Sequence, residues 1–166
     1  MATMIQPLRR APRGTRGPSF SPVIDRAELS AEFDRALAEI EDKWPDAPVR
    51  DDAFAAYVRA HLDATPDLGT RLTRLRIVDL FVVWWAMTSP AGVAAFLETF
   101  GHDLAHNIAC IEARFGHIDP RSVIDQLIVE LFTGAEPRGR EFSGFGSLRA
   151  WIEVVATQTF LDAARA

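Results

Sequence analysis

Apolar residues recur every three or four positions along most of the chain, which is the spacing of one face of an α-helix. Between residues 26 and 43 they form a single stripe that includes Phe33, Leu37 and Ile40. Pro45 follows closely, and the residue before a proline avoids helical angles. The pattern therefore predicts a helix over residues 26–43.

A second helix is predicted after the acidic pair Asp51 and Asp52, because either side chain can cap a helix N-terminus. The apolar face of this helix consists of Phe54, Tyr57, Val58 and Leu62. Pro66 and Gly69 then indicate a break in the helical pattern.

The third predicted helix, over residues 70–87, differs from the first two because its second half is apolar on most sides. A helix of that kind is usually buried all round. The run from Phe81 to Trp85 also has the β-branched and aromatic side chains that are typical of strands. A helix is the preferred interpretation, because no second strand lies nearby in the sequence to pair with this run.

Two further helix starts are marked by a capping side chain that is followed by proline, at Ser89-Pro90 and at Asp119-Pro120. They predict helices over residues 90–115 and 120–133, and a glycine follows each of these ranges as a stop signal. A loop with four glycines, residues 134–146, leads to a last helix that Ser147 caps. The complete pattern predicts an all-α fold, a single bundle of about six helices.

The last helix, over residues 147–165, divides into two sides at 100° per residue. The predicted polar side contains Arg149, Glu153, Ala156, Thr157, Phe160 and Ala164. The opposite side contains Leu148, Trp151, Ile152, Val155, Gln158 and Asp162, and it is predicted to be core apart from Gln158 and Asp162. Phe160 on the polar side has two interpretations: packing against a neighbouring helix, which is preferred, or stacking on an unpaired base.

Charge is unevenly distributed. Residues 1–24 contain four arginines, six prolines and glycines, and no acid, a composition typical of a disordered tail. The remainder holds 14 basic and 23 acidic residues, a net charge of −9, which disfavours non-specific binding to nucleic acid. The predicted organisation is a tail over 1–24, a helical extension over 25–70 and a second helical part over 71–166.

Candidate metal ligands recur every four residues at Glu98, His102, His106 and Cys110. His102 and Cys110 would lie roughly 12 Å apart along a helix, too far for one ion. His102 and His106 could form half a site with His117 or an acid from elsewhere in the chain, but an exposed helix face is the preferred interpretation, so no metal or other cofactor is expected.

Other chemistry finds little support in the sequence. The glycines at 139, 144 and 146 fit neither of the common nucleotide-binding fingerprints, and no catalytic motif occurs, so a non-enzyme is expected. The longest apolar run contains Asp79 and is about half the length of a membrane-spanning helix, so no membrane segment is expected. Cys110 is the single cysteine, which fits a cytoplasmic protein without disulfides.

The order of these parts carries a resemblance to a known family. The parts are the Trp84-Trp85 helix, the proline-started helix with Phe96 and Phe100, the 120–133 helix, the turn Phe142-Ser-Gly-Phe-Gly and the segment Leu148-Arg-Ala-Trp-Ile-Glu-Val-Val-Ala with Asp162 and Arg165. They resemble region two of bacterial RNA polymerase sigma factors of the extracytoplasmic-function class. The resemblance covers about residues 72–166 and stops before the C-terminal domain with which such factors read the −35 element, so the sequence is interpreted as a truncated copy.

The resemblance implies two surfaces. The surface that docks on the clamp helices of the polymerase beta-prime subunit would contain Ser122, Asp125, Gln126, Val129 and Glu130. The surface at or near the −10 promoter DNA would contain Arg138, Arg140, Phe142, Phe145, Arg149, Trp151, Glu153, Thr157, Gln158 and Arg165.

The first hypothesis is therefore a sigma-like protein of transcription initiation that binds RNA polymerase core and contacts promoter DNA, with an anti-sigma-like regulator as a further candidate partner. The alternative is a degenerate helical protein-interaction module that does not bind DNA. Residues 135–166 hold four arginines and four acids, and this neutral balance favours the alternative.

Overall fold

The computed structural model describes residues 26–63, 74–115 and 119–165, and within these ranges the chain is helical with no strand. The helices are α1 (Arg26–Lys43), α2 (Asp52–Asp63), α4 (Ile77–Thr88), α5 (Pro90–Phe115), α6 (Pro120–Phe132) and α7 (Leu148–Arg165), with a short 3-10 turn, η1 (Arg138–Glu141), before α7. This confirms the predicted all-α bundle of six helices. The predicted tail, the break at Pro66 and Gly69, and His117 lie outside the described residues.

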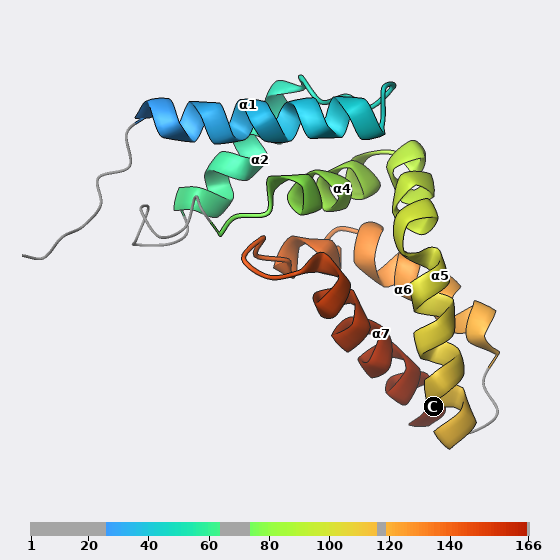
Figure 1. The fold of residues 1–166 in the computed structure, drawn as a ribbon. Helices are drawn as coiled ribbons and strands as arrows, with labels where there is room; N and C mark the ends of the chain where they lie inside the picture. The colour runs from blue at the N-terminus through green and yellow to red at the C-terminus, as the bar shows by residue number, and fades with distance from the viewer. Residues whose placement is uncertain (1–25, 64–73, 116–118, 166) are drawn as a thin grey trace, which may run out of the picture.

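Helix α4 lies at the centre of the fold, between α1 and α2 on one side and α6 and the turn before α7 on the other (Figure 1). Eight of its twelve residues are buried, which confirms the prediction of a helix buried all round. Its aromatic side chains meet those of the first two helices: the rings of Phe54 and Phe81 are 5.0 Å apart and perpendicular in arrangement. Trp44 packs edge-on against Trp85 at 6.2 Å. The predicted extension therefore shares one continuous core with the rest of the chain.

The start of α4 corrects the predicted third helix. The structure begins the helix at Ile77, and the described residues Arg74 to Arg76 before it are not helical. The backbone N–H of Arg76 donates to the carbonyl of Gly144 at 2.8 Å, so it is held by a loop that lies far away in the sequence. Arg76 has φ −90° and ψ 83°, which are not helical angles, and the helix starts one residue later.

Helix α5 packs on α4 at a close crossing near Gly92. A Cβ atom at Gly92 would lie 2.2 Å from the backbone carbonyl of Trp85, a distance that atoms never tolerate. Only glycine fits this position, because the neighbouring atoms are backbone and cannot turn aside as a side chain could.

A second, smaller apolar cluster lies at the other end of α5. Its buried members are Ile108 of α5, Val123 of α6 and Phe160 of α7. With 26 residues, α5 is roughly 39 Å long and contacts both clusters. The position of Phe160, with none of its surface exposed, confirms the preferred interpretation that this ring packs on neighbouring helices.

The predicted caps are present in the structure. The backbone N–H of Ala53 donates to Asp51, that of Ala91 donates to Ser89, and that of Ala150 donates to Ser147. The carboxylate of Asp119 accepts from the backbone of Arg121 at 3.2 Å and from the Ser122 hydroxyl at 3.1 Å. These hydrogen bonds favour the charged form and lower the pKa of Asp119 below its usual range.

Candidate functional site

The glycine-rich loop, defined here as residues 138–147, lies against the start of α4 and leads into α7 (Figure 1). Asp79 of α4 holds its far end, because the backbone N–H of Leu148 donates to this carboxylate at 3.1 Å. Asp79 also forms an ion pair of 2.6 Å with Arg76. The sequence placed Asp79 only as an interruption of an apolar run; its role as the partner of a helix N-terminus 69 residues away emerges from the fold.

Gly144 makes the tight path of this loop possible. Its φ angle is +78°, in the left-handed region that residues with a Cβ avoid. A Cβ atom there would lie 2.8–2.9 Å from the side chains of Leu75 and Leu80. The glycine therefore serves both the backbone angle and the close packing of the loop on α4.

Phe142, a predicted DNA contact, lies in the core. Only 1% of its surface is exposed, and its ring packs on Trp151 of α7 with 5.5 Å between centroids. The structure therefore contradicts the DNA contact that the resemblance implies for the Phe142 ring, because a buried apolar ring supports the fold instead. Trp151 and Phe145 are half-buried and pack against the same core.

Helix α2 contacts the glycine-rich loop through His61. Its Nε2 atom is 3.2 Å from the carbonyl oxygen of Phe142, and its Nδ1 atom is 2.9 Å from the carbonyl oxygen of Tyr57. The Tyr57 ring packs on the imidazole at 4.4 Å, and burial raises the pKa of Tyr57 to about 12. Sequence analysis offered no signal for this contact, since 81 residues separate its two partners.

Each of the four candidate DNA-binding arginines has a carboxylate within 4.0 Å. Arg138 lies between Glu130 at 3.7 Å and Glu141 at 3.9 Å, and it also donates to Gln158 at 3.3 Å. Arg140 faces Glu136 at 3.5 Å.

The other two arginines lie on α7. Arg149 forms the shorter pair, with Asp103 of α5 at 2.7 Å, and Arg165 faces Asp162 at 3.5 Å. The side chains of Arg140, Arg149 and Arg165 are more than half exposed, so water weakens these pairs. The surface has guanidinium groups to offer, but acidic neighbours neutralise them locally.

The two sides of α7 differ from the prediction. The buried side contains Leu148, Ile152, Val155, Ala156, Thr159 and Phe160. Ala156 and Phe160, predicted on the polar side, are buried, whereas Gln158 and Asp162, the predicted exceptions on the core side, are exposed. Thr157 and Glu153 are exposed as predicted, and the Thr157 hydroxyl donates to the Glu153 backbone carbonyl at 2.8 Å.

The outer face of α6, defined as Ser122, Asp125, Gln126 and Val129, is exposed along its whole length. These positions follow the three- and four-residue spacing of one helix side. Val129 is 58% exposed, which makes it one of three large apolar side chains on the described surface, with Leu97 and Val154. Glu130 instead turns toward α7, where it accepts from the buried Thr159 hydroxyl at 3.0 Å.

The His/Cys stripe of α5 is an exposed helix face. His102, His106 and Cys110 are all exposed, and Cys110 Sγ lies 3.7 Å from His106 Nε2. Across the described residues, His, Cys, Asp and Glu side chains form no group of three or more that could hold a metal ion. Within the same residues, every helix is too short or too polar to cross a membrane.

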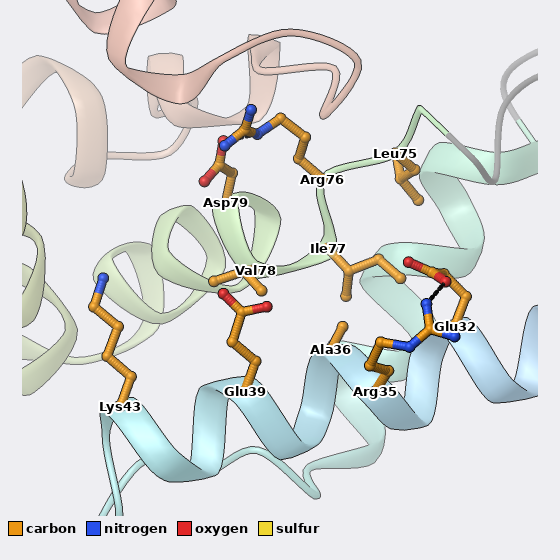
Figure 2. Close-up of a pocket in the computed structure, with 10 residues that line it drawn as sticks. All are labelled: Glu32, Arg35, Ala36, Glu39, Lys43, Leu75, Arg76, Ile77, Val78 and Asp79. Carbon is orange, nitrogen blue, oxygen red and sulfur yellow. Dashed lines mark hydrogen bonds and ion pairs between the residues drawn. The ribbon is translucent and has the colours of Figure 1, made fainter.

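The structure also contains a groove of about 400 Å³ between α1 and the start of α4, which sequence analysis did not anticipate. Figure 2 shows Glu39 of α1 reaching toward Val78 and Lys43 extending from α1 to one side of it, whereas Arg76 and Asp79 point away from α1. Three acids and three bases line the groove in near balance, and Glu32 pairs with Arg35 within it. A lining of balanced charge selects neither an anionic nor a cationic ligand.

Comparisons of the chain with protein-family models, with curated proteins and with solved structures give no match. The fold and the surface define a helical protein in which the exposed outer face of α6 and a glycine-rich loop flanked by arginines are the candidate binding surfaces.

Proposed function

We propose that the protein acts in transcription initiation as a sigma-like factor in the cytoplasm, where it binds RNA polymerase core and contributes to recognition of the −10 promoter element. The observation that carries this proposal is the outer face of α6. The resemblance assigns five residues to polymerase docking, and four of them form this exposed stripe.

The chemistry of that face suits a protein partner. An exposed valine flanked by a carboxylate and an amide offers an apolar contact surrounded by polar groups, which is how protein interfaces are commonly built. In contrast, the Glu130 side chain is engaged with Thr159 and Arg138, so it supports α7 more than it presents itself to a partner.

The promoter-contacting part of the proposal rests on the glycine-rich loop and α7. Arg140, Ser143 and Arg149 are exposed there beside the half-buried Phe145. Arginines can reach phosphate oxygens, and an aromatic ring at a surface can stack on an unpaired base. Both kinds of group lie on one short stretch of chain.

A second candidate function is a helical interaction module that binds a protein partner without binding DNA. The ion pairs of Arg138, Arg140, Arg149 and Arg165 favour it. Counterion release drives binding to nucleic acid, and an arginine already beside a carboxylate contributes less to it.

The experiment that tests the first function is capture of purified bacterial RNA polymerase core by the full chain, followed by retention of a fork-shaped −10 promoter DNA. Capture of core with retention of DNA supports the sigma-like function. Capture without DNA supports the interaction module, and no capture of core contradicts the sigma-like function.

A salt titration separates the two candidates further. If the chain contacts several phosphates, the logarithm of the DNA-binding constant decreases linearly and steeply with the logarithm of salt concentration. An apolar interface at Val129 depends far less on salt. A complex with core and DNA whose stability is insensitive to salt would therefore contradict phosphate contacts by the arginines.

A further inference from the structure

His61 occupies an unusual place for a residue of the N-terminal helices, because its two ring nitrogens face carbonyl groups that lie far apart in the sequence. Its Nε2 atom faces the carbonyl of Phe142 in the glycine-rich loop, and its Nδ1 atom faces the carbonyl of Tyr57 one turn earlier on α2. Carbonyl oxygens only accept, so the contact to the loop is a hydrogen bond when Nε2 carries the proton.

The loop is held from α4 at two other points. The Arg76 N–H donates to the Gly144 carbonyl, and the Leu148 N–H donates to Asp79. Both of these anchors lie after Phe142 in the chain. The contact with His61 is therefore the anchor that helix α2 adds at the first half of the loop, beside the exposed Arg140 and Ser143.

The local packing fixes the direction of the imidazole ring. The Tyr57 ring lies against it, with 4.4 Å between the two ring centroids. A ring that packs against a neighbouring ring delivers its Nε2 atom to one place, which is what a positioning group requires.

We infer that His61 is a positioning residue of the candidate DNA-binding surface, and that α2 supports the loop of that surface through this residue. The inference rests on the proposed function for its DNA readout. By holding the Phe142 carbonyl, His61 keeps the first half of the glycine-rich loop in one conformation, which reduces the ordering cost of binding an unpaired promoter strand.

The test compares two variants that differ in which imidazole nitrogen they imitate. The amide nitrogen of glutamine in His61→Gln reaches about as far as Nε2, and that of asparagine in His61→Asn reaches only about as far as Nδ1. His102→Asn, at an exposed histidine of α5, is the matched control. Amide hydrogen exchange in the full chain reports the loop without any DNA present, and the amides around Leu104 report global unfolding.

We expect His61→Asn to speed exchange of the loop amides about threefold to tenfold, the worth of one hydrogen bond, while the Leu104 region stays unchanged. His61→Gln should keep most of the protection, and His102→Asn should have no effect. Equal exchange in all variants, or equal loss in both His61 variants, would overturn the positioning role.

The DNA readout is separate. With core polymerase, His61→Asn should retain −10 fork DNA more weakly than His61→Gln by a similar factor. If both variants bind this DNA like the unchanged protein while loop exchange differs, the link from positioning to DNA is overturned. If the unchanged protein binds neither core nor DNA, the proposed function fails, and the exchange result still decides whether His61 positions the loop.

Discussion

The outer face of α6 and the glycine-rich loop with α7 are neighbouring surfaces of opposite character. The face of α6 leaves an apolar side chain, Val129, 58% exposed, and its polar groups are carboxylate, amide and hydroxyl. The loop and α7 bury their aromatic residue Phe142 and surround their arginines with acids. The first surface is ready for a protein partner as it stands, whereas the second must exchange ion-pair partners before it can bind phosphate.

That exchange is energetically modest. An exposed ion pair contributes about 0–1 kcal/mol, so a phosphate can replace the carboxylate of Asp103 beside Arg149 at little cost. Moving Phe142 out of the core requires more free energy, because exposing a core ring costs several times as much as breaking an exposed ion pair. Electrostatic rearrangement of this surface is therefore feasible, and release of Phe142 is not.

The largest effect is expected for Phe142→Ala. Removing a ring that is 1% exposed should lower the free energy of unfolding by about 3–5 kcal/mol. Chemical denaturation of the variant measures this loss, and Phe145→Ala, which removes a half-buried ring of the same loop, is the control with a smaller expected loss. A smaller loss for Phe142 than for Phe145 would break the contrast, because it would mean that Phe142 is available at the surface.

The next effect is expected for Val129→Asp on α6. A charge at the centre of the apolar contact should weaken binding to core polymerase about tenfold, while the stability of the chain changes by only about 0.5 kcal/mol. Val154→Asp is a matched control, because Val154 is 67% exposed on α7. Equal binding by the two variants in an equilibrium titration with core would remove the reason to treat the α6 face as the docking surface.

Smaller and opposite effects are expected from the two members of one ion pair. Arg149→Gln removes a guanidinium, so binding to −10 fork DNA should weaken about twofold to fivefold. The slope of the logarithm of the binding constant against the logarithm of salt concentration should decrease by about one. Asp103→Asn leaves Arg149 without its carboxylate at 2.7 Å and should strengthen binding by a similar factor. Fluorescence anisotropy in the presence of core measures both, and equal affinities would indicate that DNA does not reach Arg149.

The smallest effect at neutral pH is expected for Tyr57→Phe beneath the loop. Tyr57 Oη is buried and, within the described residues, has no hydrogen-bond partner, so its removal should change stability by only about 0.5 kcal/mol or less. Burial raises the pKa of Tyr57 to about 12, so the protonated form is favoured in the folded state. Its contribution to stability should be complete below pH 10 and decrease as the pH rises toward 12.

This titration is directly observable, because Tyr57 is the only tyrosine in the chain. Near-ultraviolet absorbance of tyrosinate should show a midpoint near pH 12 in the folded protein, and the alkaline loss of stability should be weaker in Tyr57→Phe. A midpoint near 10 in the folded protein would show that α2 does not cover this side of the loop.

The elements that the sequence predicts well are those with local signals. The bounds of α1 and α5 agree with the predicted ranges, because a proline, a cap or a glycine stands at their ends. The start of α4 could not be predicted, because the backbone of Arg76 is fixed by Gly144. Nothing in the sequence around Arg76 or Gly144 indicates that these two segments meet, because the contact depends on the tertiary fold.

The candidate site follows the same rule. The outer stripe of α6 was implied by the resemblance, and four of the five residues that the resemblance assigns to it are exposed. The sides of α7 were assigned partly wrongly, because helical spacing cannot say which of two adjacent stripes meets α5. The pairing of Arg149 with Asp103 and the contact of His61 with Phe142 depend on tertiary packing alone.

Helix α5 has a consequence for how the chain melts. The small cluster of Ile108, Val123 and Phe160 buries too little apolar surface to persist alone, and the helix that carries Ile108 is continuous with the one that packs on α4. Unfolding of the larger core around α4 should therefore also unfold α5 and the small cluster at its far end. Because the first two helices share one buried core with the later ones, we expect no boundary of cooperativity near residue 70.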